Sequence, residues 1–149
     1  MRVVVCGSDT LAYRLVHELA TIHGADVTVV RSGPEPDDLS VAEIPRVTVV
    51  TAARFDHAVC QRVDLASADA LALVDQNDGG NIDAALLARE WAPDVRIVMR
   101  VFDETLASSM HDLLADCIVL SATAVAAPAF VAAAEGGDEP TAMRVADRL

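Results

Sequence analysis

Residues 2–12 read RVVVCGSDTLA, a run of valines followed by a glycine and then by the start of a segment with helical periodicity. The apolar run over 2–6 predicts a buried strand, and Gly7 predicts a tight turn after it. Beyond the turn, large apolar residues recur every three or four positions, which predicts a helix over 10–23: Leu11, Leu15, Leu19 and Ile22. Gly24 is expected to end this helix. A strand, a glycine turn and a helix are typical of the first unit of a parallel α/β sheet.

The same alternation of apolar runs and amphipathic segments continues along the chain. Further strands are expected at 27–30, 47–50, 70–74, 95–101 and 117–120, with helices at 56–63, 80–91, from 103 and from about 122. The proline-rich segment 32–45 is expected to be a loop with at most a turn of helix at 39–43. Because the strands are almost entirely apolar, both faces of the sheet should be covered. We therefore predict a Rossmann-like, doubly wound, mainly parallel six-stranded α/β sheet with helices on both faces over residues 1–134, followed by a polar, flexible tail over 135–149.

Composition narrows the classes of function. The chain has 149 residues, 53% of them hydrophobic, and a formal net charge of −12, and all 11 basic residues are arginine. The absence of lysine excludes a Walker phosphate loop and Schiff-base chemistry. The acidic balance disfavours nucleic acid as a partner. Direct membrane insertion is not expected, because the longest uncharged apolar run, 122–134, contains Pro128 and is too short to span a bilayer. Three widely spaced cysteines suggest reduced thiols in a cytoplasmic protein.

The turn after the first strand is where a doubly wound fold binds the phosphates of a dinucleotide. The fingerprint there is GxGxxG, whereas this chain has Gly7-Ser8-Asp9-Thr10-Leu11-Ala12. Asp9 replaces the middle glycine and brings bulk and negative charge to the place of the phosphate. Two interpretations remain open: Asp9 caps the following helix in place of a phosphate, which we favour, or the turn still binds a dinucleotide.

The end of the second strand also departs from an ordinary dinucleotide site. An acidic residue normally binds the ribose hydroxyls there, and the corresponding residue in this chain is Arg31. An arginine at this point suits a ribose phosphate, or it is simply a solvated strand end. A further hypothesis is a scaffolding domain in which Asp9 and Arg31 pair with each other and close the cleft.

Four segments together resemble a known family: 3–7, 70–78 with Asn81, 93–101 and 115–121. In this order they are similar to the N-terminal domain of regulators of potassium conductance, the Trk-type nucleotide-binding domain, and the resemblance extends over about 2–134. It implies a cytoplasmic regulatory module, rather than an enzyme, that forms homodimers or larger rings. These rings attach to the pore subunit of a potassium channel or transporter, at the inner face of the membrane. It also implies that this chain is a piece of a larger channel-like protein or a subunit that needs partners.

The resemblance also implies a ligand and the residues that hold it. Ligands of the family are NAD, NADH, ATP or ADP, with calcium in some members, and the positions that match its binding residues are Gly7, Asp75, Asn81 and Arg100. The candidate cofactor site therefore comprises these four residues with Ser8, Asp9, Thr10 and Arg31. The family's Gly-Asp-Ala segment after the third strand reads Thr51-Ala-Ala53 here, so an acid that helps to hold the nucleotide is missing. We expect binding of NAD or an adenine nucleotide to be weakened or lost.

Other sequence patterns give less information about function. Residues 75–80 open like a calcium-binding loop, but its twelfth position is Leu86 rather than a bidentate glutamate, so no EF-hand is expected; Asp78 is instead expected to cap the next helix. The four histidines have no metal-ligand spacing, and no catalytic cluster is evident. The final helix, with Phe130 and Val131, is expected to contact a neighbouring subunit. The alternative function is the nucleotide-binding domain of an NAD(P)-dependent oxidoreductase whose catalytic domain is missing.

Overall fold

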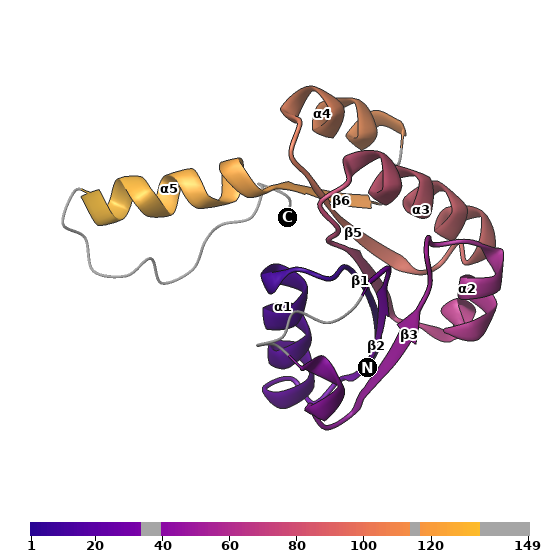
Figure 1. Ribbon diagram of the computed structural model, residues 1–149. Helices are drawn as coiled ribbons and strands as arrows, with labels where there is room; N and C mark the ends of the chain where they lie inside the picture. Colours follow the sequence, from indigo (N-terminus) through magenta and orange to yellow (C-terminus); the bar gives the residue numbers. More distant parts are fainter. Residues whose placement is uncertain (34–39, 114–116, 135–149) are drawn as a thin grey trace.

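A single all-parallel sheet forms the centre of the protein. The computed structural model describes residues 1–33, 40–113 and 117–134, and within them six strands lie in the order β3-β2-β1-β4-β5-β6 (Figure 1). The strands are β1 (Arg2–Cys6), β2 (Asp26–Arg31), β3 (Val47–Thr51), β4 (Ala70–Leu73), β5 (Arg96–Val101) and β6 (Cys117–Ser121). This order confirms the predicted Rossmann-like, doubly wound fold, and every pair of neighbouring strands is parallel.

Helices follow the strands as the periodicity predicts. They are α1 (Thr10–Thr21), α2 (His57–Arg62), α3 (Asp78–Trp91), α4 (Glu104–Leu113) and α5 (Ala122–Ala134), with short 3₁₀ turns η1 (Val41–Glu43) and η2 (Leu65–Ser67). Helix α1 ends at Thr21, two residues earlier than expected, and Gly24, with φ of 63°, takes the left-handed conformation shortly after the C-cap residue Ile22. Residue 39 of the expected turn of helix and the predicted tail over 135–149 lie outside the described residues.

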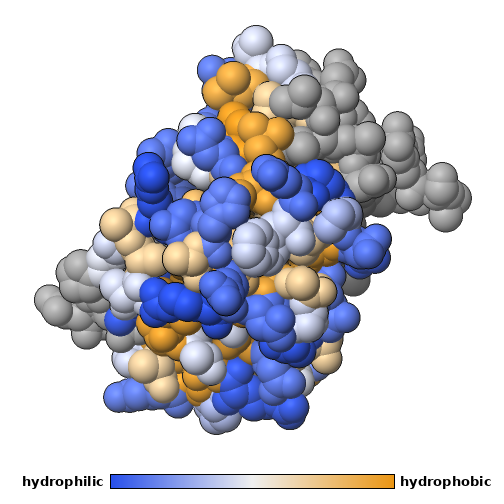
Figure 2. All heavy atoms as spheres, turned by 90° about the vertical axis from the view of Figure 1, so that its right-hand side faces the viewer, coloured by the Kyte–Doolittle hydropathy of each residue, from blue (hydrophilic) through white to orange (hydrophobic). Residues whose placement is uncertain are grey.

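The two faces of the sheet have separate hydrophobic cores. Because side chains alternate along a strand, Val3 and Val5 face α1 and η1, whereas Val4 and Cys6 face α2, α3 and α4. Figure 1 shows α1 on one side of the sheet and α2, α3 and α4 on the other. Seen from outside, the α2–α4 face is largely polar with bands of apolar side chains between the polar ones (Figure 2). Both faces of the sheet are therefore covered, as the apolar strands predict.

The last helix departs from this layered arrangement. Helix α5 leaves the end of β6 and extends away from the sheet (Figure 1). Its Phe130 is 76% exposed and its Val131 is 56% exposed. No helix in the described part of the chain has the length and apolar character needed to cross a membrane.

The order in which the strands are added to the sheet reverses between β1 and β4, and this reversal positions the site. From β1 the chain builds outward through β2 to β3 on one side, and from β4 through β5 to β6 on the other. Consequently, the turns that follow β1 and β4 lead to opposite faces of the sheet. In such sheets a crevice opens at the carboxyl ends of the strands where this reversal occurs.

The buried core should govern stability. Ile97 on β5 is fully buried, and we expect Ile97→Ala to lower the free energy of unfolding by about 2–5 kcal/mol, because it removes apolar contacts and leaves a cavity. Leu86 on α3 is 43% exposed and serves as the control, since Leu86→Ala should cost less than about 1 kcal/mol. Urea denaturation measures both values, and equal losses would contradict the assignment of the core.

Candidate functional site

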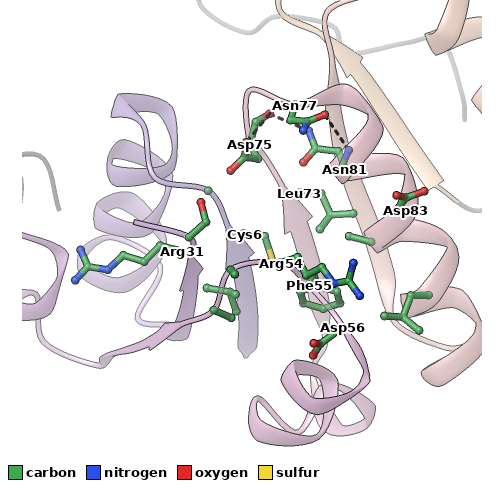
Figure 3. Close-up of a pocket in the computed structure, with 18 of the residues that line it drawn as sticks. Cys6, Arg31, Arg54, Phe55, Asp56, Leu73, Asp75, Asn77, Asn81 and Asp83 are labelled. Carbon is green, nitrogen blue, oxygen red and sulfur yellow. Dashed lines mark hydrogen bonds between the residues drawn. The ribbon is translucent and has the colours of Figure 1, made fainter. Parts of the chain in front are cut away.

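A cavity of about 440 Å³ lies at the carboxyl ends of the central strands. Its walls come from the ends of β1, β2 and β4, from the loop after β3 with the first residue of α2, and from the first three turns of α3. Figure 3 shows Asp75, Asn77 and Asn81 together on one wall, whereas Arg31 and Arg54 extend in opposite directions. The cavity therefore occupies the crevice that the doubly wound order predicts.

The predicted site residues divide into two groups. Gly7, Arg31, Asp75 and Asn81 line the cavity. Ser8, Asp9, Thr10 and Arg100 are not among its described lining residues, and Asp9 and Arg100 instead contact each other beside it.

Gly7 makes the turn after β1 possible because it has no side chain. A Cβ atom at this position would lie 2.9 Å from Cγ2 of Val74 and 3.1 Å from Cβ of Ala12. The Gly7 N–H donates to the carbonyl of Val30 at 3.1 Å, which keeps the turn close to β2. The glycine of the fingerprint is thus retained for packing between β1, β4 and α1.

Asp9 caps helix α1. Its Oδ1 accepts a hydrogen bond from the Ala12 N–H at 3.0 Å, as the capping interpretation predicts. Its Oδ2 lies 2.9 Å from Nη1 of Arg100 and 3.4 Å from Nε2 of Gln76. Partial burial alone would raise the pKa of Asp9, but these hydrogen bonds and the Arg100 guanidinium hold that pKa below its usual value. The carboxylate therefore occupies the position at the helix N-terminus where a bound phosphate would receive the same donors.

The hypothesis that Asp9 pairs with Arg31 is wrong, because the partner of Asp9 is Arg100. Arg100 stands at the end of β5, and its side chain is only 9% exposed. Its guanidinium lies 4.7 Å from the centroid of the Phe102 ring. The Nε and Nη2 atoms of Arg100 have no hydrogen-bond partner among the described residues. Asp9 thus supplies the counter-charge for a guanidinium that is almost withdrawn from water.

Asn81 links the cavity wall to the ion pair. Its Nδ2 donates to the backbone carbonyl of Asp75 at 2.9 Å and to that of Arg100 at 3.0 Å. Asn81 is 2% exposed, so both of these bonds are shielded from water. Three of the predicted residues, Asp75, Asn81 and Arg100, are therefore brought together by one side-chain amide.

The cap of α3 differs from the prediction. Asn77, not Asp78, caps the helix by accepting from the Gly80 N–H at 3.1 Å. Asp78 accepts from the backbone N–H groups of Phe102 and Asp103 at 3.0 and 3.1 Å, and so it holds the loop after β5. The expectation for Asp78 was wrong because both residues suit the cap position, and only the path of the β5–α4 loop decides between them.

Sequence patterns missed part of the cavity wall. Arg54, Phe55 and Asp56 follow β3 and line the cavity, and Asp83 faces it from α3. Asp56 also caps α2 by accepting from the Val59 N–H at 3.0 Å. The signal available was the position of these residues just after a strand at the binding edge of the sheet.

Burial keeps two described thiols, one of them at the cavity, in their protonated form at neutral pH. The Cys6 thiol lines the cavity, and burial, with smaller effects of Cys60 and Asp75, raises its pKa far above the usual value. Burial likewise raises the pKa of Cys117 to about 11. The His57 ring packs edge-on against Trp91, with centroids 5.7 Å apart. Within the ranges that the structure describes, no three His, Cys, Asp or Glu side chains are grouped as metal ligands.

The fold and the cavity define a doubly wound α/β domain with its crevice between the first and fourth strands. The TrkA-N domain model matches residues 3–121, and the chain belongs to this family. This membership confirms the resemblance seen in the sequence.

Solved structures with the same fold include the following three. The AMP-bound form of the Kef C-terminal domain from Shewanella denitrificans has a TM-score of 0.69 at 14% identity and covers 93% of this chain and 83% of its own. The RCK domain of GsuK has a TM-score of 0.74 at 17% identity, with 91% of this chain and 28% of the other covered. The NAD(P)-binding domain of an exopolyphosphatase-related protein from Archaeoglobus fulgidus has a TM-score of 0.74 at 23% identity, with coverages of 90% and 97%. A comparison with curated protein sequences finds no match.

The ion pair predicts a difference between two capping aspartates. Asp9→Ala removes a helix cap and also leaves the buried Arg100 guanidinium without its counter-charge. We therefore expect a loss of about 2–4 kcal/mol in the free energy of unfolding. Asp56→Ala removes only the cap of α2 and should cost about 1 kcal/mol. Urea denaturation of both variants tests this, and a loss no larger for Asp9→Ala would show that the ion pair adds nothing.

The lowered pKa of Asp9 predicts a dependence of stability on pH. A carboxylate whose pKa is depressed by folding contributes stability above its unfolded value, about 3.9, and this contribution is lost as pH falls through the folded value. The stability difference between the wild type and Asp9→Asn should therefore be constant from pH 7 to 5 and shrink below about pH 4. Unfolding curves across this range measure the difference, and a gap that widened in acid would contradict it.

Proposed function

We propose that the chain is a regulatory domain, for gating or assembly, of a potassium channel or potassium uptake system on the cytoplasmic side of the membrane. The observation that carries this proposal is the match of the TrkA-N model across residues 3–121. The same fold is found in the Kef C-terminal domain and in the RCK domain of GsuK. The name RCK, for regulator of potassium conductance, supports the same assignment. In this role the chain acts by changing its contacts rather than by catalysis.

The chemistry of the cavity supports a role without catalysis. The Cys6 thiol is kept protonated by burial, and His57 packs against an aromatic ring. The positions that an NAD(P)-dependent oxidoreductase uses to hold its cofactor are Asp9 and Arg31 here, rather than a glycine and an acid. These substitutions favour the regulatory function over the oxidoreductase fragment.

Dinucleotide binding is weakened in this proposal because Asp9 competes with the ligand. A pyrophosphate needs the N–H groups at the start of α1, and the Ala12 N–H already donates to Asp9. Arg100, a cation beside that turn, is paired with the same carboxylate. A phosphate would have to displace an ion pair and then lie beside a negative charge.

A homodimer, or a ring built from dimers, completes the proposal. Helix α5 extends from the sheet with Phe130 76% exposed and Val131 56% exposed, and Ile118 on the adjoining β6 is 45% exposed. Apolar side chains presented in this way are typical of a contact surface. A second copy of the chain is the proposed partner at α5, as the family resemblance implies.

The proposed contact predicts the effect of a charge on α5. Phe130→Asp should convert the dimer to a monomer, because a carboxylate would be buried without a counter-charge in the contact. Ile22→Asp, at the end of α1 and 71% exposed, is the matched control and should leave the dimer intact. Light scattering after size exclusion gives the mass of each variant. A fully dimeric Phe130→Asp protein would rule out this use of α5.

The regulatory function is tested by potassium uptake. Cells that lack this chain should show altered uptake of potassium or rubidium, and expression of the wild-type chain should restore it. Phe130→Asp should fail to restore uptake, whereas Ile22→Asp should succeed. Normal uptake in the deletion strain at both limiting and high potassium would overturn the proposal.

A further inference from the structure

We infer that the cavity takes an uncharged ribonucleoside in preference to a nucleotide or dinucleotide. The inference rests on the proposed function in that it assigns a ligand class to the regulatory cleft of the same domain. It depends on where the cavity ends and on which charges line it. It also depends on the ion pair between Asp9 and Arg100, which occupies the adjacent turn after β1.

Among the described residues, those that line the cavity belong to one half of the crevice. Its described lining comes from the ends of β1, β2 and β4, the loop after β3, and α3, and it includes neither residues 8–10 nor any residue of β5. A dinucleotide crosses the turn before α1 with its pyrophosphate and places its second half beyond it. In this chain the turn and the end of β5 are occupied by Asp9 and Arg100 in contact with each other. The described lining of this cavity therefore lies on one side of the turn.

Donors for a phosphate are poorly arranged around this space. Asp9 already uses the Ala12 N–H and one edge of Arg100. Arg31 and Arg54 extend in opposite directions, so they do not form a clamp on one anion (Figure 3). Arg54 is exposed, and its attraction for a phosphate is screened by water. The cavity lining includes more aspartates than arginines, which further disfavours an anion. The aspartates are Asp56, Asp75 and Asp83, and the arginines are Arg31 and Arg54.

The same lining suits a planar ring joined to a polyol. Half-buried Phe55 and Leu87 and buried Leu73 provide apolar contact for a base. The carboxylate of Asp75 accepts the Asn77 N–H at 3.2 Å and, as an acceptor with several lone pairs, retains the capacity to accept hydroxyl groups of a ribose. Figure 3 shows this carboxylate on the wall formed with Asn77 and Asn81. A nucleoside meets both requirements without bringing a phosphate near Asp9.

The test compares ligands that differ only in phosphate. Isothermal titration calorimetry measures the dissociation constants of adenosine, AMP and NAD for the wild-type chain. The dissociation constant of adenosine should be lower than that of AMP by a factor of about ten or more, because the phosphate dianion of AMP would lie near the Asp9 carboxylate. NAD should bind no more tightly than AMP. Thermal shift at millimolar ligand gives a second readout on the same protein. This comparison needs no variant, so it does not depend on whether a substituted chain folds.

Variants then assign the preference to Asp9. Asp9→Asn keeps the size of the side chain and a capping oxygen but removes the charge, so the adenosine-to-AMP ratio should fall about tenfold. Asp103→Asn is the matched control: it removes the charge of another helix-capping aspartate at this edge of the sheet, outside the cavity lining, and should leave the ratio unchanged.

Two results would overturn the inference. One is AMP or NAD binding to the wild type as tightly as adenosine; the other is no binding of adenosine at millimolar concentration by either readout. Neither result would affect the potassium uptake or the light-scattering experiments, so failure of the ligand assignment is distinguishable from failure of the proposed function. An adenosine preference that survives in Asp9→Asn would also overturn the role given to the Asp9 charge.

Discussion

The ion pair between Asp9 and Arg100 connects parts of the chain that the strand order would otherwise leave separate. A guanidinium with 9% exposure needs a counter-charge, and the cap of α1 supplies it at 2.9 Å. The pair fastens the turn after β1 to the end of β5, and β4 lies between these two strands. Asn81 adds the β4–α3 segment by bonding the carbonyls of Asp75 and Arg100. The Asp9–Arg100 ion pair and the Asn81 amide together connect the carboxyl ends of β1, β4 and β5.

The sequence was sufficient to predict the fold because each strand is a short apolar run and helices such as α1 and α4 have an amphipathic face. The role of Asp9 as a cap was also predictable, since a carboxylate just before a helix satisfies free N–H groups whatever the rest of the fold does. Its ionic partner was not, because pairing across a sheet depends on strand order and register. Cys6 is level with Leu73, and Leu73 with Met99, so Arg100 stands one residue beyond the end of β1 with a single strand between them. Arg31 lies on the other side of β1, and the sequence alone gave no reason to prefer one arginine.

The rest of the site was predicted in part for a similar reason. Gly7, Arg31, Asp75 and Asn81 line the cavity because they follow strands at the binding edge. Arg54, Phe55 and Asp56 lie in a loop whose direction is set by packing of α2, and no periodicity in the sequence describes it. The choice between Asn77 and Asp78 as the cap of α3 likewise depended on a distant loop, which recruits Asp78 through Phe102 and Asp103. Local chemistry thus specified the candidates, and tertiary contacts assigned their partners.

The double use of Asp9 also constrains how this cleft can change in evolution. A substitution of Asp9 alone leaves the buried Arg100 guanidinium without its counter-charge. A substitution of Arg100 alone removes the ionic partner of the Asp9 carboxylate at the turn. The two positions are therefore epistatic: each is tolerated in the context of the other. A lineage that recovers an open phosphate-binding turn has to replace both residues, or to acquire a ligand anion that takes over the counter-charge at the same time. Positions 9 and 100 should accordingly vary together among related chains, although they are 91 positions apart in the sequence.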